Sequence, residues 1–443
     1  MMIRFYKNII LFFIASSYWL LADSSFAFSQ DMMTLNQVVE ITLKNNFNIL
    51  IAKSLSDINA NDVTPGNAGM LPQVSLNASG NTASNSTKQH YSSGPDVNKS
   101  GVGSNAISSG VALNWTLFDG MKMFATYDKL KELKTMGELN LKIEIENNIA
   151  KVFAAYYDVV RQKQLIKSAS ESISIYEERE KIAQARFNIG SGSKLEVMQA
   201  RVDVNALKSQ LFKYQTALYD VKASLNNLLA RSPETDFDVG DSIAITYNPK
   251  YEELKTSIEK QNNGLLFSEG SLKVSDLTLK EMRALRYPKL GVNANYNFSR
   301  SENQAGFVLL NQNLGFNAGF TASWNLFNGF EVNRQVKDAQ IQTMVSKLRY
   351  DMTKLQVQTN LATAYRNFEQ AKELLKMEEE NSKIAKENVE VALESFRIGK
   401  TSSLELKDIQ KSYDDALVRL ANSCYDAKAA ETELMRLNGI LVK

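Results

Sequence analysis

Two carboxylates at the start of a predicted helix are the side chains with the clearest chemical potential. Glu405 and Asp408 lie three positions apart, so a helix presents both on one face. Copies of this pair gathered around a threefold axis would raise one another's pKa values and attract cations. Each residue also has a local explanation, because Glu405 completes a Ser-x-x-Glu capping box with Ser402 and Asp408 complements the helix dipole. The sequence leaves both roles open.

A third carboxylate, Glu196, follows Ser193 in a second Ser-x-x-Glu box, and here helix capping is the preferred interpretation. Other reactive groups are scarce. One cysteine (Cys424) and one histidine (His90) cannot form a disulfide framework or a Cys/His metal site. The chain has no Walker A loop, no G-x-S-x-G and no H-E-x-x-H. We therefore predict no enzymatic activity, no cofactor and no metal.

The overall composition excludes two further classes. Lys and Arg total 51 and Asp and Glu total 49, which leaves a formal net charge of +2 and no basic surface for nucleic acid. The hydrophobic fraction of 44% is ordinary for globular chains and excludes a bundle of membrane helices. A length of 443 residues allows two or three domains.

The N-terminal residues have the pattern of an export signal. Arg4 and Lys7 precede an apolar run at 9–21, and a small-x-small motif ends at Ala27. The run is shorter than the roughly 20 residues that a membrane helix needs. We predict a signal peptide at residues 1–27, cleaved after Ala27, and an exported mature chain.

The rest of the chain is a tandem duplication. Segment 112–120, which ends Trp-Thr-Leu-Phe-Asp-Gly, returns 209 positions later as 321–329, which ends Trp-Asn-Leu-Phe-Asn-Gly. Phe-Asn-Ile-Gly at 187–190 returns as Phe-Arg-Ile-Gly at 396–399, again 209 positions later. We divide the mature chain into a first repeat at 28–230, an equatorial linker at 231–250 and a second repeat at 251–443.

Long helices dominate both repeats. They are predicted at 34–64, about 121–187 and about 193–229, and again at 251–286, about 330–396 and about 402–438. All six prolines lie outside 96–232 and 289–443, so the longest helices meet no helix breaker. Heptad seams at 197–228 and 406–437 indicate coiled-coil packing. Each longest helix would extend about 100 Å.

A tight turn ends each of these longest helices. Gly190 and Gly399 suit the left-handed cap position, and Gly192 is a further turn glycine. Apolar residues flank both turns: Ile189, Leu195, Ile398 and Leu404. A buried staple and an exposed docking residue have the same appearance in sequence, so their role stays open at this stage.

Before each longest helix the hydrophobic period changes to two. Strands are predicted at about 72–80, 108–118, 289–299 and 315–327, while the Ser-, Asn- and Gly-rich segment 81–105 is predicted as a loop in water. One strand face is apolar and the other is polar without charge, as in membrane-spanning strands of about 9–11 residues. Trp115, Phe118, Trp324 and Phe327 would suit the membrane interface. The alternative is a soluble sheet with one face on a core.

Four strands cannot close a barrel in hydrocarbon, where open edges leave backbone groups unpaired. Two copies would supply eight strands, whose side chains fill the interior, whereas three would supply twelve and leave a pore. The strands therefore predict an oligomer, and a conducting role favours a trimer.

The paired strand-to-helix junctions and paired turns resemble those of the TolC-type outer-membrane efflux protein family, over about residues 34–443. The resemblance implies a mainly α fold with a membrane β part, in which duplicated coiled-coil hairpins form an α-barrel and four strands per protomer enter a 12-stranded trimeric β-barrel. It implies a homotrimer in outer-membrane lipid with a long periplasmic extension. The implied function is the exit duct of an efflux or type I secretion system, docked to a periplasmic adaptor and an inner-membrane pump or ABC exporter.

The resemblance also implies residue roles. Glu405 and Asp408 match acidic rings at the closed periplasmic aperture, and Glu196 matches an outer-hairpin acid that helps to hold the closed state. Phe396 stands where some members have a gate tyrosine, and Thr401 stands where they have arginine, so the polar latch of those members is incomplete here. The turn residues named above would form the adaptor-docking tips. The competing hypothesis is a coiled-coil structural protein or adhesin, anchored in the outer membrane or periplasmic, without a conducting pore.

Overall fold

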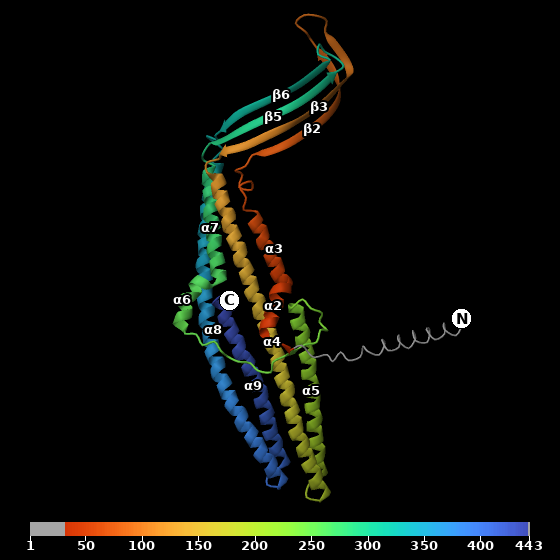
Figure 1. The fold of residues 1–443 in the computed structure, drawn as a ribbon, viewed down its shortest axis with the longest axis vertical. Helices are drawn as coiled ribbons and strands as arrows, with labels where there is room; N and C mark the ends of the chain where they lie inside the picture. Colours follow the sequence, from red (N-terminus) through yellow and green to blue (C-terminus); the bar gives the residue numbers. More distant parts are fainter. Residues whose placement is uncertain (1–31, 442–443) are drawn as a thin grey trace, which may run out of the picture. The chain divides into compact units, whose positions relative to one another are not determined.

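The computed structural model describes residues 32–441, which divide into two compact units (Figure 1). The first unit contains residues 32–42, 152–244 and 374–428, and the second contains 43–151, 245–373 and 429–441. The predicted signal peptide at 1–27 lies outside the described residues. Among the described residues, no helix is both long and apolar enough to cross a membrane.

Helices make up most of the described chain. In order they are α2 (Leu35–Asn45), α3 (Phe47–Asn61), α4 (Lys122–Asn188), α5 (Lys194–Leu228), α6 (Tyr251–Gln261), α7 (Asn263–Ala284), α8 (Glu331–Arg397) and α9 (Ser403–Leu437). The longest two, α4 and α8, each have 67 residues, in agreement with the proline-free stretches. The strands are β1 (Met32–Met33), β2 (Gln73–Gln89), β3 (Val97–Phe118), β4 (Asp238–Val239), β5 (Lys289–Asn303) and β6 (Leu310–Ser323).

The second unit carries a four-stranded antiparallel sheet in the order β2-β3-β5-β6 (Figure 1). Its register aligns the alternating residues of all four strands into rows. One apolar row consists of Leu76, Val111, Tyr296 and Phe316. The next row, on the opposite face, consists of Ser75, Ala112, Asn295 and Asn317. The sheet therefore has one apolar face and one uncharged polar face, as predicted.

The strands are longer than predicted, and the prediction of a loop at 81–105 is wrong. β2 continues to Gln89 and β3 begins at Val97, because backbone pairing extends through the Ser- and Asn-rich residues. β6 is displaced towards the N-terminus, since it begins at Leu310 and ends at Ser323 instead of spanning 315–327. Trp324 and Phe327 therefore lie after the strand rather than inside it.

Four helices of the second unit lie side by side in the same order as the strands to which they connect. Gly137 of α4 lies close to Asn59 of α3, where an added Cβ would meet the amide at 2.6 Å. Lys129 of α4 pairs with the buried Glu281 of α7 at 2.5 Å. Contacts between α7 and α8 include the Ser275 and Ser346 hydroxyls, 2.6 Å apart. The order α3-α4-α7-α8 thus repeats the order β2-β3-β5-β6.

The helices predicted at 34–64 and 251–286 are each two helices in the structure, and an asparagine lies at each division. Asn46 separates α2 from α3 and accepts hydrogen bonds from the N–H groups of Asn48 and Ile49. Asn262 separates α6 from α7 and accepts one from Leu265. An Asn side chain is a favourable N-cap, so it starts a new helix where the hydrophobic pattern alone indicates continuity.

The two asparagines are 216 positions apart, as are Pro72 and Pro288 before the first strand of each hairpin. The offset after the hairpins is 209, so the β5–β6 segment is seven residues shorter than the β2–β3 segment. The difference falls around the far turns, at 90–96 and 304–309, where length is unconstrained by packing.

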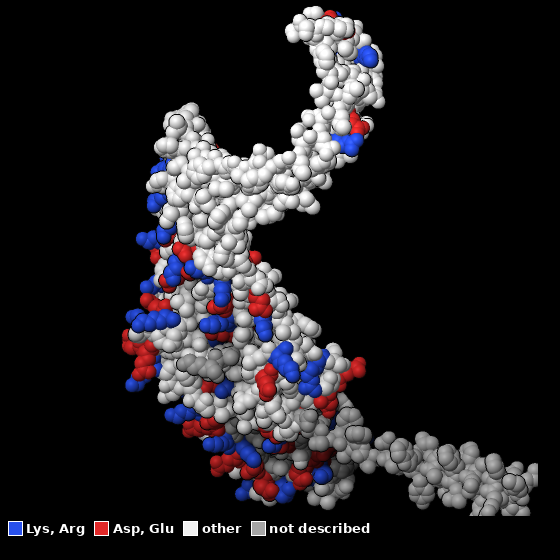
Figure 2. Space-filling model, turned by 45° about the horizontal axis from the view of Figure 1, so that its top comes forward, with Lys and Arg blue, Asp and Glu red and all other residues white. Residues whose placement is uncertain are grey.

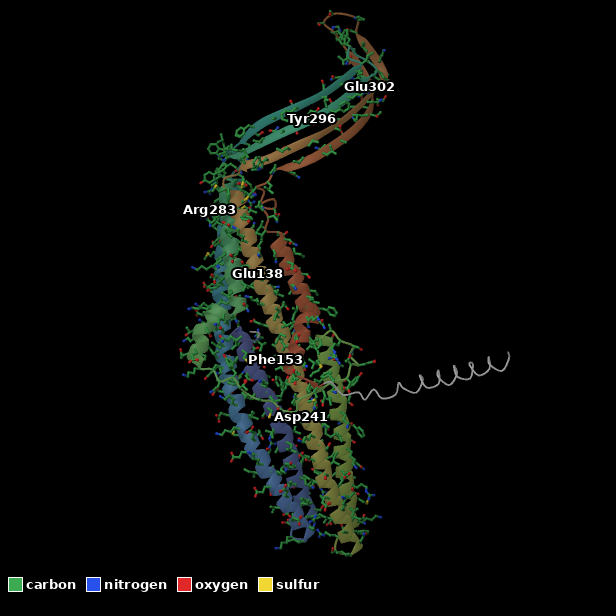
Figure 3. The ribbon with its side chains drawn as sticks, viewed as in Figure 1. Glu138, Phe153, Asp241, Arg283, Tyr296 and Glu302 are labelled. Carbon is green, nitrogen blue, oxygen red and sulfur yellow. The ribbon has the colours of Figure 1, made fainter. Side chains whose placement is uncertain are left out.

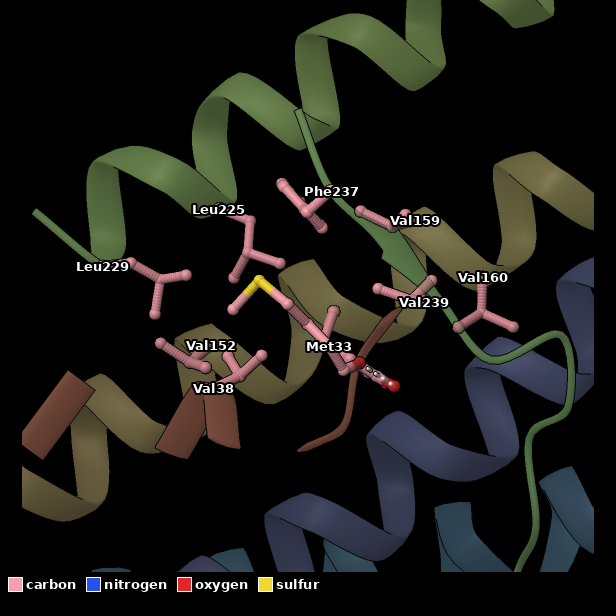
Figure 4. Close-up of a cluster of buried hydrophobic side chains, with 10 residues drawn as sticks. Met33, Val38, Val152, Val159, Val160, Leu225, Leu229, Phe237 and Val239 are labelled. Atoms are coloured by element: carbon pink, nitrogen blue, oxygen red, sulfur yellow. Dashed lines mark hydrogen bonds between the residues drawn. The ribbon is translucent and has the colours of Figure 1, made fainter. Parts of the chain in front are cut away.

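The core of the first unit forms where the linker crosses the helices. Leu225 and Leu229 from the end of α5 pack with Val152 and Val159 of α4 (Figure 4). Phe237 in the linker is fully buried in the same cluster. β4 of the linker pairs in parallel with β1, and the Tyr156 hydroxyl donates to the Met33 carbonyl. Residues 231–244 of the predicted linker therefore belong to this unit, whereas 245–250 belong to the second unit, where Ile245 and Tyr247 pack against its core.

Replacing Asn262 with alanine is expected to lower the free energy of unfolding by about 1–2 kcal/mol. The change removes the cap to Leu265 and a second hydrogen bond, in which the Asn262 side chain donates to the Leu437 carbonyl. Thermal unfolding followed by circular dichroism measures the loss. Asn45→Ala, an exposed position in the last turn of α2, is the matched control. Equal melting temperatures for the two variants would contradict the capping role.

Candidate functional site

The two helical turns predicted as docking tips have nearly the same backbone. In the first unit, α4 turns into α5 at 189–193 and α8 turns into α9 at 398–402. Gly190 and Gly399 both have φ of 78°, the left-handed region that other residues enter only with strain. Ser191 donates to the Arg186 carbonyl at 2.9 Å, and Lys400 donates to the Ser395 carbonyl at 2.8 Å. Both glycines are left-handed helix caps.

Gly192 is required for a different reason. A Cβ at this position would lie 2.9 Å from the Cβ of Arg186, a distance that real Cβ atoms do not tolerate. Its N–H donates to the Arg186 carbonyl at 3.0 Å, so the turn closes tightly on α4. The equivalent position in the second repeat is the half-buried Thr401.

The apolar residues of the turns point into solvent in this protomer. Their exposed fractions are 79% for Ile189, 63% for Leu195, 66% for Ile398 and 69% for Leu404. A hydrophobic staple would bury these side chains against the adjoining helix. They are not staples here, and four apolar side chains remain available at the turns.

Glu405 forms a complete capping box. The Ser402 N–H and hydroxyl donate to its carboxylate at 3.0 and 3.1 Å, and the Glu405 N–H donates to the Ser402 hydroxyl. These donors hold the pKa of Glu405 below its ordinary value, so the exposed carboxylate is charged at neutral pH. Asp408 is also exposed. The cap engages one carboxylate oxygen of Glu405, which leaves the other free to face a partner.

Glu196 departs from the symmetry expected of the two boxes. The Glu196 N–H donates to the Ser193 hydroxyl at 3.2 Å, which is half of a capping box. Its carboxylate atom Oε2 is buried and accepts no hydrogen bond. The predicted Ser193 cap is therefore confirmed, whereas Glu196 Oε2 takes no part in a reciprocal bond.

Phe396 is fully buried, which decides its role inside one protomer. It packs in an apolar cluster with Ile182, Val197 and Leu406, which joins the end of α8 to α4, α5 and α9. The Arg186 guanidinium lies over its ring, 4.9 Å from the centroid. Phe396 therefore holds the two hairpins together by apolar packing. A tyrosine at this position would add a hydroxyl group that can form a hydrogen bond.

A buried polar network, not anticipated from sequence, lies above this cluster. Arg179 of α4 is 1% exposed and donates to Gln410 of α9 at 3.0 Å and to Asp203 of α5 at 2.9 Å. The Asp203 carboxylate also accepts a hydrogen bond from the Lys407 ammonium of α9, with 2.9 Å between Nζ and Oδ1. One carboxylate and one guanidinium therefore connect three helices.

The network continues one turn further along the same helices. Asp414 of α9 accepts hydrogen bonds from the hydroxyls of Ser172 and Tyr176 of α4. Burial raises the pKa of Asp414 above its ordinary value, and the adjacent Asp415 adds to this effect. A cavity of about 520 Å³ adjoins these residues, with Leu207 and Val418 among its apolar lining.

A sequence signal for this network does exist. Ser172, Tyr176 and Arg179 follow helical steps of four and three, and Gln410 and Asp414 are one turn apart. Polar residues at such spacing resemble a solvated helix face, and only the tertiary structure shows that they face one another. Among the described residues, no group of His, Cys, Asp and Glu is arranged to hold a metal ion.

The aromatic residues predicted for a membrane interface lie at the base of the sheet in the second unit. The Trp115 indole donates to the Met70 carbonyl at 2.9 Å, and the Trp324 indole donates to the Arg286 carbonyl at 3.0 Å. Phe118 is half-buried, whereas Phe327 is exposed and contacts Phe330 edge to face. An amphipathic ring with its N–H satisfied and its face exposed suits an interface, so these positions remain candidates.

Comparison with known proteins identifies relatives along nearly the whole chain. The family model described as outer membrane efflux protein matches residues 38–231 and 259–439. Outer membrane protein TolC of Escherichia coli is 21% identical over 455 residues, which cover 95% of this chain and 87% of TolC. Outer membrane efflux protein BepC of Brucella suis is 18% identical over 333 residues, covering 74% and 71%. The crystal structure of the CmeC outer membrane channel of Campylobacter jejuni superposes with a TM-score of 0.77 at 16% identity, covering 94% of this chain and 91% of CmeC.

Asp414→Asn is expected to remove a pH-dependent component of stability. Because the folded state raises the pKa of Asp414, folding favours the protonated carboxyl. Its contribution to stability is therefore present at low pH and is lost as pH rises from the ordinary value of 3.8 through the raised one.

Melting temperatures measured between pH 4 and pH 7 test this expectation. The wild type should lose stability relative to Asp414→Asn as pH rises, whereas the exposed Asp220→Asn should run parallel to the wild type. Parallel curves for Asp414→Asn and the wild type would show that Asp414 is solvated.

Proposed function

From the premise that this chain belongs to the outer membrane efflux protein family, we propose that it is one protomer of a homotrimeric outer-membrane channel. The channel is the exit duct of an efflux or type I secretion system. It spans the outer membrane by its strands and extends into the periplasm by its helices. The second unit supplies the membrane part, and the turns of the first unit supply the periplasmic docking surface.

The uncovered apolar face of the sheet is the observation that carries this proposal. Val74, Leu76, Phe316 and Phe320 are all more than half exposed. The apolar rows of β5 run for nine positions, from Leu290 to Phe298, which is the span of a tilted membrane strand. Tyr296 lies within this band and Glu302 beyond it (Figure 3). A soluble protein would bury such a face, whereas lipid covers it without a protein partner.

The charged residues are also distributed differently between the sheet and the helices. In the space-filling view most of the sheet is free of Lys, Arg, Asp and Glu, and charged atoms gather near its far end and over the helices (Figure 2). Within the apolar band the opposite face carries Asn, Ser, Thr and Gly, which suit a water-filled lumen. Lipid on one side and water on the other account for both faces.

The sheet edges define how copies join. β2 and β6 each lack a partner on one side within the described chain, and unpaired edges are not tolerated in hydrocarbon. β6 of one copy beside β2 of the next continues the antiparallel order and satisfies both edges. This contact is head to tail, and repeated copies form a ring when the rotation between them closes, which also leaves no edge unpaired.

The edge helices support the same assembly. Exposed apolar residues follow heptad steps on α3, next to β2: Phe47, Ile51, Leu55 and Ile58. A second exposed stripe lies on α8, next to β6: Ile341, Met344, Leu348, Met352 and Leu355. Two such stripes form a coiled-coil seam when α8 of one copy meets α3 of the next. Three copies are the smallest ring that leaves a pore, since eight strands fill their own interior and twelve do not.

The turns are proposed to dock a periplasmic adaptor, which connects the channel to an inner-membrane pump or ABC exporter. Ile189, Leu195, Ile398 and Leu404 offer exposed apolar side chains on turns fixed by Gly190, Gly192 and Gly399. Rigid turns present such contacts at little cost in conformational entropy. Transport energy would come from that partner.

The periplasmic aperture is proposed to carry the exposed carboxylates Glu405 and Asp408. Both lie at the start of α9, and a threefold axis would bring six of them together. Glu196 is assigned to the outer hairpin, in the first turn of α5. Phe396 and Thr401 complete this region by packing rather than by a hydroxyl–guanidinium latch.

Arginine placed on each face of β5 tests the membrane assignment. Ala294→Arg puts a charge on the apolar face and should destabilise the inserted barrel by about 2–4 kcal/mol per protomer. The matched variant Asn295→Arg, on the lumenal face, should insert normally and shift selectivity towards anions. Outer-membrane fractionation and planar-bilayer conductance measure both effects. Equal insertion of the two variants, or a stable soluble monomer of the wild type, would refute the proposal.

Asp408→Asn tests the aperture. The loss of three carboxylates should lower the preference for cations at low salt by about twofold or more, and raise antibiotic leak. Reversal potentials in a KCl gradient give the permeability ratio. Asp426→Asn, an exposed carboxylate further along α9, should behave as the wild type. An unchanged ratio in a normally assembled Asp408→Asn channel would exclude Asp408 from the aperture.

A further inference from the structure

Charged residues are few on the four strands of the sheet, and they lie towards its two ends. β6 has none, and the other strands carry Lys88, Lys99, Lys289, Arg300 and Glu302. Lys88 and Lys99 lie close to the far turn of their hairpin, and Arg300 pairs with Glu302 beyond the apolar band. Lys289, the first residue of β5, is the charged residue at the end of the sheet that follows α7.

The register of the sheet places Lys289 on the polar face. Lys289 pairs with Ser323 of β6, as Asn293 pairs with Gly319. Successive side chains of a strand point to opposite faces, so Lys289 shares its face with Asn293, whereas Leu290 lies on the apolar face. The Lys289 side chain is exposed, and none of the ion pairs within the described chain includes it. Its ammonium group therefore faces the side that is assigned to the lumen.

Beyond Lys289 the polar face of β5 and β6 is uncharged. Its residues are only Gly, Asn, Ser and Thr, from Gly291 to Asn303 on β5 and from Asn311 to Ser323 on β6. No carboxylate on this part of the face offsets the ammonium group. A charge at the wall of a water-filled passage concentrates ions of the opposite sign. The effect extends over one Debye length, which is about 10 Å at 0.1 M salt and about 30 Å at 0.01 M.

We propose that Lys289 is the charge-selective residue of the β-barrel. In the ring, each copy presents one ammonium group to the lumen where the helices lead into the strands, and these groups draw in the anionic parts of transported molecules. The inference rests on the proposed channel function and adds to it the residue and the class of chemical group that it favours. Its sign is opposite to that of the carboxylates proposed for the aperture, so the two regions of the passage prefer opposite charges.

A thiol placed beside Lys289 measures the local potential. Ser323→Cys, in a Cys424→Ser background, puts the thiol on the strand position that pairs with Lys289. Its rates of reaction with an anionic sulfonatoethyl and a cationic trimethylammonioethyl methanethiosulfonate are measured on the reconstituted protein. Lys289→Gln should lower the ratio of anionic to cationic rates about threefold to fivefold at about 0.01 M salt, and Lys289→Glu should lower it further. About 1 M salt should remove most of the difference.

Asn311→Cys is the matched control, because it lies on the same face at the other end of β6. Its rate ratio should be the same with Lys289 and with Lys289→Gln. An unchanged ratio at Ser323→Cys, or an equal change at both positions, would show that Lys289 does not set the potential of the lumen and would refute the inference. If neither thiol reacts in the assembled protein, this face lines no water-filled passage, and the proposed channel function fails instead.

Discussion

In the proposed channel, the requirement that backbone hydrogen bonds be satisfied in hydrocarbon governs the assembly. A four-stranded sheet with an apolar face has two unpaired edges, and no segment of the described chain covers either of them. Joining β6 of one copy to β2 of the next resolves both edges at once. The proposed ring, its pore and the head-to-tail contact of α8 with α3 all follow from that single constraint, since each strand leads directly into or out of a helix.

Because the sequence is duplicated, each half of the chain supplies one pair of strands to the sheet. Each repeat contributes one strand hairpin and one long helical hairpin, so the order of the helices repeats the order of the strands. Symmetry is kept where packing requires it, as at Gly190 and Gly399, whose backbones share one φ value. It is lost where packing does not, as in the seven-residue difference between the strand hairpins. The capping boxes also diverge, since Glu405 closes its box and Glu196 does not.

The two helical hairpins also differ in the contacts that hold them. In the first hairpin, α4 and α5 are joined by the tight turn at Gly192 and by ion pairs, among them Arg179 with Asp203. The second meets it through a mixture of apolar and polar contacts, Phe396 near the turn and Arg179 above it. The apolar cluster at Phe396 and the hydrogen bond from Arg179 to Gln410 thus join the two hairpins at two levels.

Sequence alone determined the duplication, the long helices, the alternating strands and the turn glycines, because these depend on period, on proline placement and on local backbone preference. It misplaced the strand ends and joined α2 to α3, since backbone pairing of Ser- and Asn-rich residues and capping by Asn46 do not alter the hydrophobic pattern. Only the tertiary structure decided that Ile189 and Leu404 are exposed, that Phe396 is buried and that Arg179 faces Gln410. Those outcomes depend on which helix faces meet across more than two hundred residues, and no local pattern specifies that.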